Sequence, residues 1–156
     1  MLLASLTAQR EHILGILDGL DDQALSRPVL PTGWSCAGLV QHLAVDVERF
    51  WFRVVVAGEQ AARESFGDDS AWTLSATTTP TSVLALYREE IDRSNRVIES
   101  TSLDAAPAAW PEELFGDFRL QDLEAVLVHV ITETACHAGH LDAARELIDG
   151  RTWLIL

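Results

Sequence analysis

The chain has 156 residues, of which 48% are hydrophobic, and its 24 acidic and 11 basic residues give a formal net charge of −13 at pH 7. Such a charge repels the phosphates of nucleic acids and of anionic membrane surfaces, so neither is expected as a partner. This length and hydrophobic content predict one folded domain over residues 1–156, with a core of its own.

No apolar stretch approaches the roughly 20 residues that a membrane-spanning helix needs. The N-terminal segment MLLASLTAQREH lacks the basic start, the long apolar centre and the small-residue cleavage site of a secretory signal. We therefore expect a soluble, cytoplasmic protein that has no membrane partner.

Hydrophobic residues recur at helical spacing in four long segments, and no segment alternates in the manner of a strand, which predicts an all-α protein. The first helix is expected over residues 2–20, where the acidic pair Asp21 and Asp22 ends it. The residues expected on its buried face are Leu3, Leu6, Ile13, Ile16 and Leu17.

The second helix is expected to begin after Ser35, since serine is a favoured N-cap residue. It should end between Gly58 and Gly67, and a loop to Thr79 follows in which Trp72 is expected to pack against the helices. The apolar face of this helix is expected to consist of Leu39, Leu43, Val47, Phe50 and Val54.

Thr79 followed by Pro80 is the clearest helix start in the chain, because proline is well suited to the first helical position. This third helix should fray over residues 100–102, before a connection that contains two prolines. The fourth helix is expected over residues 120–149, ahead of Gly150, which suits a left-handed cap. Four helices of this length predict a four-helix bundle.

The fourth helix carries HVITETACHAGH, which runs from His129 to His140. At 3.6 residues per turn, His129, Glu133 and His137 follow one another at steps of about 40°, and His140 falls between the first two. We expect this polar stripe to face the bundle interior, where imidazoles and a carboxylate are costly unless they are satisfied. A divalent cation would satisfy them. The apolar residues that flank the stripe are Val126, Val130, Leu141, Ala144 and Leu147.

Glu133 and His137 are four residues apart, so they can bind one ion from successive turns of a helix. Metal sites in bundles usually take a further ligand from a facing helix, and His42 is the one histidine of the second helix. We therefore predict a metal centre formed by His42, Glu133 and His137. Three protein ligands leave coordination positions of the metal open for water or substrate, which is typical of a catalytic site.

Other side chains are candidates for orienting the ligands or contacting substrate. His129 and His140 share the stripe and could orient a ligand or position a proton. On an α-helix, Asp46, Arg49 and Arg53 lie near the side that carries the helix-two histidine. Asp46 could support a ligand there, and an arginine such as Arg53 could bind an anionic substrate. A solvated charged face explains these residues about as well. His12 is expected to be structural.

Other chemistries lack their sequence signals. Cys36 and Cys136 are too few for a disulfide scaffold, and both are expected in the core. Cys136 points about 100° away from His137 on a helix, which disfavours a nucleophile–base pair. No nucleophile elbow and no phosphate-binding glycine loop is present. The remaining alternatives are a metal-dependent hydrolase that uses bound water, a non-catalytic metal-binding or ligand-sensing bundle, and a stripe satisfied by hydrogen bonds and water.

Two segments carry a resemblance to a known family. PTGWSCAGLVQHLAVDVERFWF and, much later, ETACHAGHLDAARELIDG resemble the DinB/YfiT-like superfamily of metalloenzymes, in the branch related to mycothiol-dependent maleylpyruvate isomerase. The resemblance covers nearly the whole chain. It implies a four-helix bundle that holds zinc or nickel through a helix-two histidine and two residues four apart on the last helix, which here are His42, Glu133 and His137.

The resemblance also implies a chemistry. Many relatives have histidine at the position of Glu133, whereas the isomerase branch has glutamate. His140 stands where many relatives have glutamine, so His140 is expected to be a poorer ligand than its neighbours. The implied enzyme uses a small thiol, such as mycothiol, for S-transfer to or isomerisation of a small electrophile, with the thiol acidified by the metal. The sequence ends soon after the expected fourth helix, at RTWLIL, so a counterpart of the isomerase's C-terminal domain is not expected and that reaction is not carried over. A homodimer through exposed aromatic residues such as Trp153 is a further expectation.

Overall fold

The computed structural model describes residues 1–65 and 69–153, and all the regular structure in these residues is helical, which confirms the all-α prediction. None of the helices in this part of the chain has the length and apolar character needed to cross a membrane. The long helical segments are α1 (Leu2–Ile16), α3 (Cys36–His42) continued by the π-helix η1 (Leu43–Val56), α4 (Pro80–Ser100) and α6 (Leu123–Asp149). The short ones are α2 (Asp22–Ser26), α5 (Glu112–Phe115) and the 3₁₀ helices η2 (Gln60–Ser65) and η3 (Asp69–Trp72).

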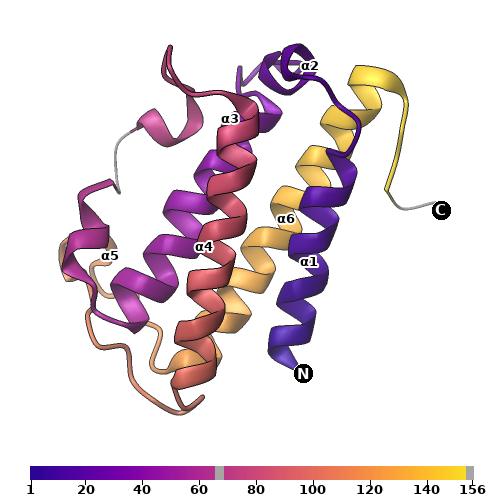
Figure 1. Cartoon of the computed structure of the whole chain (residues 1–156). Coiled ribbons are helices and arrows are strands. Elements are labelled where there is room, and N and C mark those ends of the chain that lie inside the picture. The colour runs from indigo at the N-terminus through magenta and orange to yellow at the C-terminus, as the bar shows by residue number, and fades with distance from the viewer. Residues whose placement is uncertain (66–68, 154–156) are drawn as a thin grey trace.

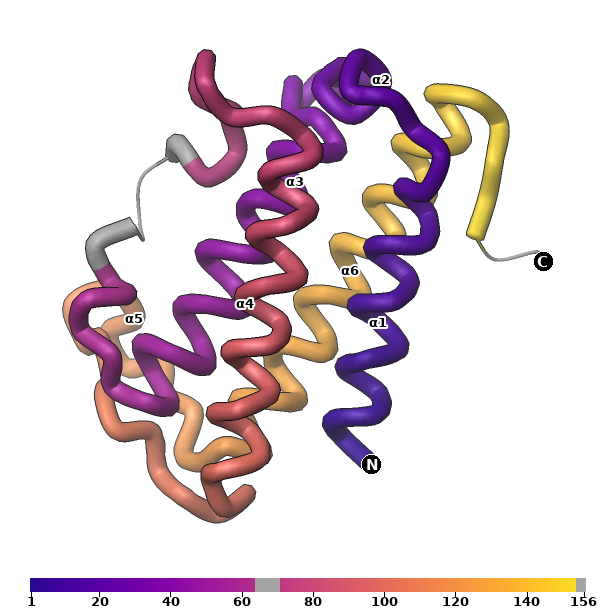
Figure 2. The backbone as a smooth tube through the Cα atoms, viewed as in Figure 1, coloured from indigo at the N-terminus to yellow at the C-terminus, as the bar shows by residue number. Residues whose placement is uncertain are grey.

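The four long segments lie side by side in two directions (Figure 1). α1 and α6 run one way and pack on each other, while α3–η1 and α4 run the opposite way and also pack on each other. Because η1 and α4 are parallel neighbours, the chain must travel back along the molecule between them. Among the described parts of this connection, η2 lies against η1 and η3 lies against α3, near the start of α4 (Figure 2).

Several helix ends follow the sequence signals. Ser35 caps α3, where its hydroxyl oxygen accepts a hydrogen bond of 3.1 Å from the Gly38 backbone N–H. Thr79 and Ser82 form a reciprocal capping box at the start of α4. Gly150 ends α6 with a left-handed φ of 77°. Each cap gives a partner to a backbone group that the helix itself leaves unsatisfied.

Other boundaries differ from the prediction. α1 ends at Ile16 rather than near residue 20. Asp21, expected only to end that helix, caps the short helix α2 with its side chain. α6 begins at Leu123 rather than near residue 120, because the Asp122 side chain caps it. Gly67, the expected start of a loop, lies outside the described residues.

The second long helix is α-helical only as far as His42, and from Leu43 to Val56 it is a π-helix. In a π-helix each backbone hydrogen bond joins residues five apart, and one turn contains about 4.4 residues rather than the 3.6 of an α-helix. Hydrophobic spacing at the 3.6-residue period of an α-helix does not reveal this change in winding. The residues predicted for its apolar face are nonetheless buried: Leu39, Leu43, Val47, Phe50 and Val54.

The core contains a charged pair that joins three helices. Arg10 of α1 donates to both carboxylate oxygens of Glu48 of η1, at 2.6 and 2.7 Å, and to Asn95 of α4 at 2.8 Å. The side chains of Arg10 and Glu48 are only 3% and 1% exposed. Removing such charges from water is costly, and this bidentate geometry offsets much of that cost.

The two cysteines differ in burial. Cys36 is buried, as predicted, whereas Cys136 is exposed, so the prediction of a core position is wrong for Cys136. The buried face of α6 passes through Thr134 and Ala138. Residue 136 lies about 200° around the helix from each of them, so its side chain faces away from the core.

Arg10→Met should leave the Glu48 carboxylate buried without its counter-ion. We expect the free energy of unfolding, measured by urea denaturation, to fall by about 3–5 kcal/mol. The double variant with Glu48→Met should recover much of this loss, because neither charge is then stranded. Arg96→Met, at an exposed position of α4, is the matched control. Equal stability of Arg10→Met and the wild type would contradict the role given to this pair.

Candidate metal centre

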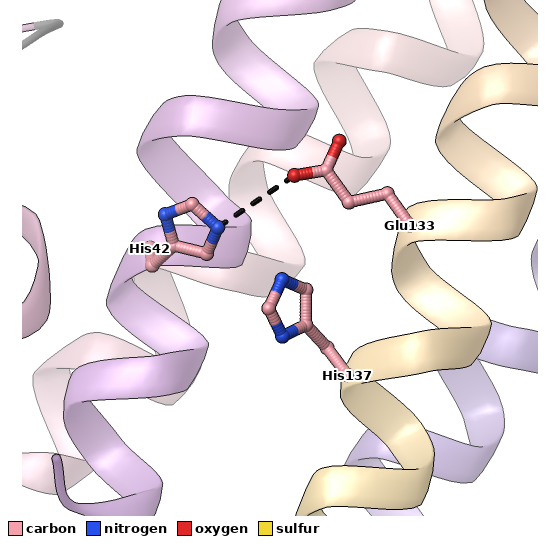
Figure 3. Close-up of side chains that lie close together, drawn as sticks. All are labelled: His42, Glu133 and His137. Atoms are coloured by element: carbon pink, nitrogen blue, oxygen red, sulfur yellow. Dashed lines mark ion pairs between the residues drawn. The ribbon is translucent and has the colours of Figure 1, made fainter. Parts of the chain in front are cut away.

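His42, Glu133 and His137 face one another across the space between α3 and α6 (Figure 3). One possible ligand atom from each of the three side chains lies within 4.8 Å of the other two. His42 Nε2 is 3.7 Å from Glu133 Oε1, and the rings of His42 and His137 are 5.1 Å apart. Within residues 1–65 and 69–153, this triad is the one group of three or more such side chains that could hold a metal ion.

The triad lies at the edge of the core rather than inside it. The His42 and Glu133 side chains are 12% and 28% exposed, and His140 is exposed. Leu147, expected to flank a buried stripe, is 59% exposed. The expectation of an interior stripe is therefore only partly met. α6 packs its buried face against α1 and turns the polar stripe toward α3, where the stripe stays partly exposed.

Asp46 holds the His42 ring. His42 Nδ1 is 2.8 Å from Asp46 Oδ2, and since a carboxylate only accepts, the proton is assigned to Nδ1. The lone pair of neutral His42 then lies on Nε2, which faces Glu133. The second carboxylate oxygen, Asp46 Oδ1, is buried and accepts no hydrogen bond from the described residues.

Glu133 is held in its charged form. Burial by itself would raise the pKa of this carboxyl, but the close approach of the His129 and His42 imidazoles, with the attraction of their positive charge, lowers the pKa to about 2. His129 Nε2 lies 3.3 Å from Glu133 Oε2. The carboxylate is therefore ionised at neutral pH.

The two imidazoles of the triad are shifted in opposite directions. Burial, together with repulsion by His42 and His140, lowers the pKa of His137 to about 4 against the attraction of Glu133. Burial opposes the charged form of His42 as well, but the hydrogen bond to Asp46 and the attraction of the Asp46 and Glu133 carboxylates raise its pKa above the usual value. A proton therefore competes with a cation more strongly at His42 than at His137, whereas His137 and Glu133 are ready to bind at pH 7. Two imidazole nitrogens and one carboxylate oxygen form a donor set that fits a divalent cation.

Trp72 covers the triad from the connection between η1 and α4. Its ring stacks on His42 at 4.1 Å with an interplanar angle of 19°, and meets His137 edge-on at 5.8 Å. Gln41 donates a hydrogen bond to the Ala71 carbonyl at 3.0 Å. A Cβ at Gly38 would lie 2.2 Å from the Trp72 carbonyl oxygen, so the close approach of this segment requires glycine there.

The remaining candidates lie at different distances from the triad. His129 contacts Glu133, and His140 Nδ1 is 3.4 Å from His137 Nδ1. Arg53 instead donates to Glu90 of α4 at 3.0 and 3.1 Å, and also to Glu59, so the structure does not place it beside the triad.

The π-helix explains both the position of Arg53 and a residue that the sequence did not suggest. At about 100° per residue, an α-helix would place Arg53 only about 20° from His42, whereas about 82° per residue in a π-helix places it on the opposite side. The same winding brings Trp51 to within about 20° of His42, and its ring lies 4.5 Å from that of His129. Only knowledge of the π-helix would have identified Trp51.

His12 lies apart from the triad in a pair of its own. Its Nε2 is 2.9 Å from both carboxylate oxygens of Asp142, and the Trp153 ring stacks on it at 5.2 Å. Trp153, the residue suggested for a dimer contact, is 43% exposed. A homodimer stays a prediction.

Comparison with known proteins identifies the family of the chain. No curated protein and no solved structure matches the chain. The family model described as Mycothiol-S-transferase matches residues 1–150, a span that contains all four long helical segments and the triad. The chain therefore belongs to the mycothiol-S-transferase family.

Proposed function

We propose that this protein is a divalent-metal-dependent transferase that joins mycothiol to a small electrophile at a centre formed by His42, Glu133 and His137. The observation that carries the proposal is the convergence of a carboxylate and two imidazoles from two helices at a half-open position. Membership of the mycothiol-S-transferase family supplies the thiol and the class of reaction. The helices are proposed to form one four-helix bundle domain over residues 1–156.

The three ligand residues have different roles in this proposal. Glu133 contributes the negative charge that balances the cation, and its low pKa keeps it ionised. His137 contributes a neutral imidazole nitrogen at pH 7. His42 contributes Nε2, with its ring held between Asp46 and the Trp72 ring. This mixed nitrogen and oxygen set suits zinc and nickel alike.

The chemistry that the centre would support is thiol activation. A bound divalent cation would lower the pKa of a neighbouring thiol, so that the nucleophilic thiolate forms near neutral pH. His129 and His140 flank the triad at its two ends, where either imidazole can accept the thiol proton. Trp72 shields His42 and His137 from water on one side, which strengthens the electrostatic interactions at the centre.

Zinc-loaded protein should convert mycothiol and iodoacetamide into the S-alkylated thiol, measured by liquid chromatography, and should use glutathione poorly. His42→Ala and His137→Ala should reduce the rate to that of the uncatalysed reaction, because each removes a ligand. His12→Ala, the same substitution at a histidine paired with Asp142, should keep the activity.

Consumption of electrophile that persists without any thiol would contradict the proposal and favour a hydrolase. Zinc binding without turnover of any thiol would favour a non-catalytic bundle.

Asp46→Ala should weaken zinc binding by roughly 10–100-fold, the usual effect of removing a carboxylate that orients a ligand histidine. The measurement is a competition with a chromophoric chelator at pH 7.5. Asp92→Ala, at an exposed position of α4, removes the same charge from the chain without touching the triad and should leave the affinity unchanged. Equal affinities for Asp46→Ala and the wild type would show that Asp46 does not support the centre.

A further inference from the structure

Four aromatic side chains gather at the end of the triad where His129 lies, and we call them the aromatic shelf. Its members are Trp51 of η1, with Trp110, Phe115 and Phe118 from the connection between α4 and α6. Phe115 stacks on Trp51 at 5.4 Å, and it lies 5.5 Å from Trp110 and 5.9 Å from Phe118. The connection therefore folds back so that its aromatic rings continue the row that Trp51 begins.

The aromatic shelf is continuous with the proposed metal centre. His129 lies 4.5 Å from the Trp51 ring and 6.1 Å from the Phe118 ring, measured between centroids. The same imidazole is 3.3 Å from the Glu133 carboxylate. A single side chain therefore separates the shelf from a proposed ligand, so a small molecule can touch both.

Part of the aromatic shelf is open to solvent. Trp51 is only 4% exposed and forms its floor, whereas Phe118 is 47% exposed and the His129 side chain is 33% exposed. An apolar ring left in water gains free energy when a ligand covers it, in proportion to the area removed from water. Phe118 thus offers an apolar surface to a molecule held beside Glu133.

The opposite end of the triad has a different character. His140 is exposed, and Trp34, at 6.3 Å, is its one neighbouring aromatic ring other than histidine among the described residues. Among the described residues, no cluster of rings comparable with the aromatic shelf extends from His140. The two ends therefore present different surfaces to the two substrates of a transfer reaction.

We infer that the aromatic shelf binds the apolar part of the electrophile, and that preferred substrates carry an aromatic ring at or next to the carbon that the thiolate attacks. This inference rests on the proposed function. In the transfer, an electron pair on sulfur forms the new sulfur–carbon bond. The bond from carbon to the leaving group breaks and its electron pair departs with that group. The thiol proton passes to His129 or His140 and from that imidazole to solvent. Selection then depends on apolar contact with the exposed ring of Phe118, beside the buried floor that Trp51 forms.

The direct test is the binding of 1,3-dinitrobenzene, an aromatic probe that has no leaving group, measured by calorimetry on the purified chain. Phe118→Ala should weaken binding by roughly tenfold, the size expected for the loss of one aromatic contact. Phe118→Leu should lose less, because it keeps an apolar surface. Leu147→Ala, at an apolar position on α6 that is 59% exposed, should not change the affinity. Absence of binding to the wild type, or equal binding by Phe118→Ala, would overturn the inference.

Turnover separates this inference from the proposed function. With mycothiol, Phe118→Ala should raise the KM for 1-chloro-2,4-dinitrobenzene by roughly tenfold, while the KM for iodoacetamide, which has no ring, should change little. An equal change for both electrophiles would overturn the inference and leave the transferase activity standing. Binding of dinitrobenzene that depends on Phe118, without any thiol transfer, would keep the shelf as a binding site and refute the proposed function.

Discussion

The winding of η1 is the constraint on which the candidate site depends. From His42 onward, steps of about 82° rather than 100° decide which side chains face α6 and which face α4. Asp46 and Trp51 stay on the side of His42, where they contact His42 and His129. Arg53 turns to the other side and binds Glu90 of α4. An α-helix over the same residues would turn Arg53 toward the triad and would turn Trp51, the floor of the aromatic shelf, away from it.

Packing elsewhere in the molecule leaves the interface between α3 and α6 free for polar groups. α1 rests on α6, and η1 rests on α4. Arg10 then joins α1 to η1 through Glu48 and to α4 through Asn95. Because these contacts hold the helices in place, the polar side chains between α3 and α6 need not contribute to stability. They can instead retain an ionised carboxylate and a neutral imidazole at neutral pH, as Glu133 and His137 do.

The sequence was most informative where the backbone is regular. α6 is a continuous α-helix, so the spacing of Glu133 and His137 was sufficient to place both on one face, and His42 lies in α3 before the π-helix begins. Capping signals placed the starts of α3 and α4 because they depend on local hydrogen bonds. The helix directions and the π-helix were not predictable from hydrophobic spacing. Trp72 reaches His42 only because Gly38 has no side chain to block the Trp72 backbone. This contact joins residues far apart in the sequence, so no local sequence pattern predicts it.

His42, Glu133 and His137 are proposed to hold one divalent cation together, and the stoichiometry of metal binding tests this proposal most directly. Protein purified without an affinity tag should bind one zinc ion per chain in equilibrium dialysis at pH 7.5. His42→Ala, Glu133→Gln and His137→Ala should each lose this binding while keeping their helical circular dichroism. Zinc binding that survives all three substitutions, or a wild type that binds no stoichiometric zinc or nickel, would contradict the account.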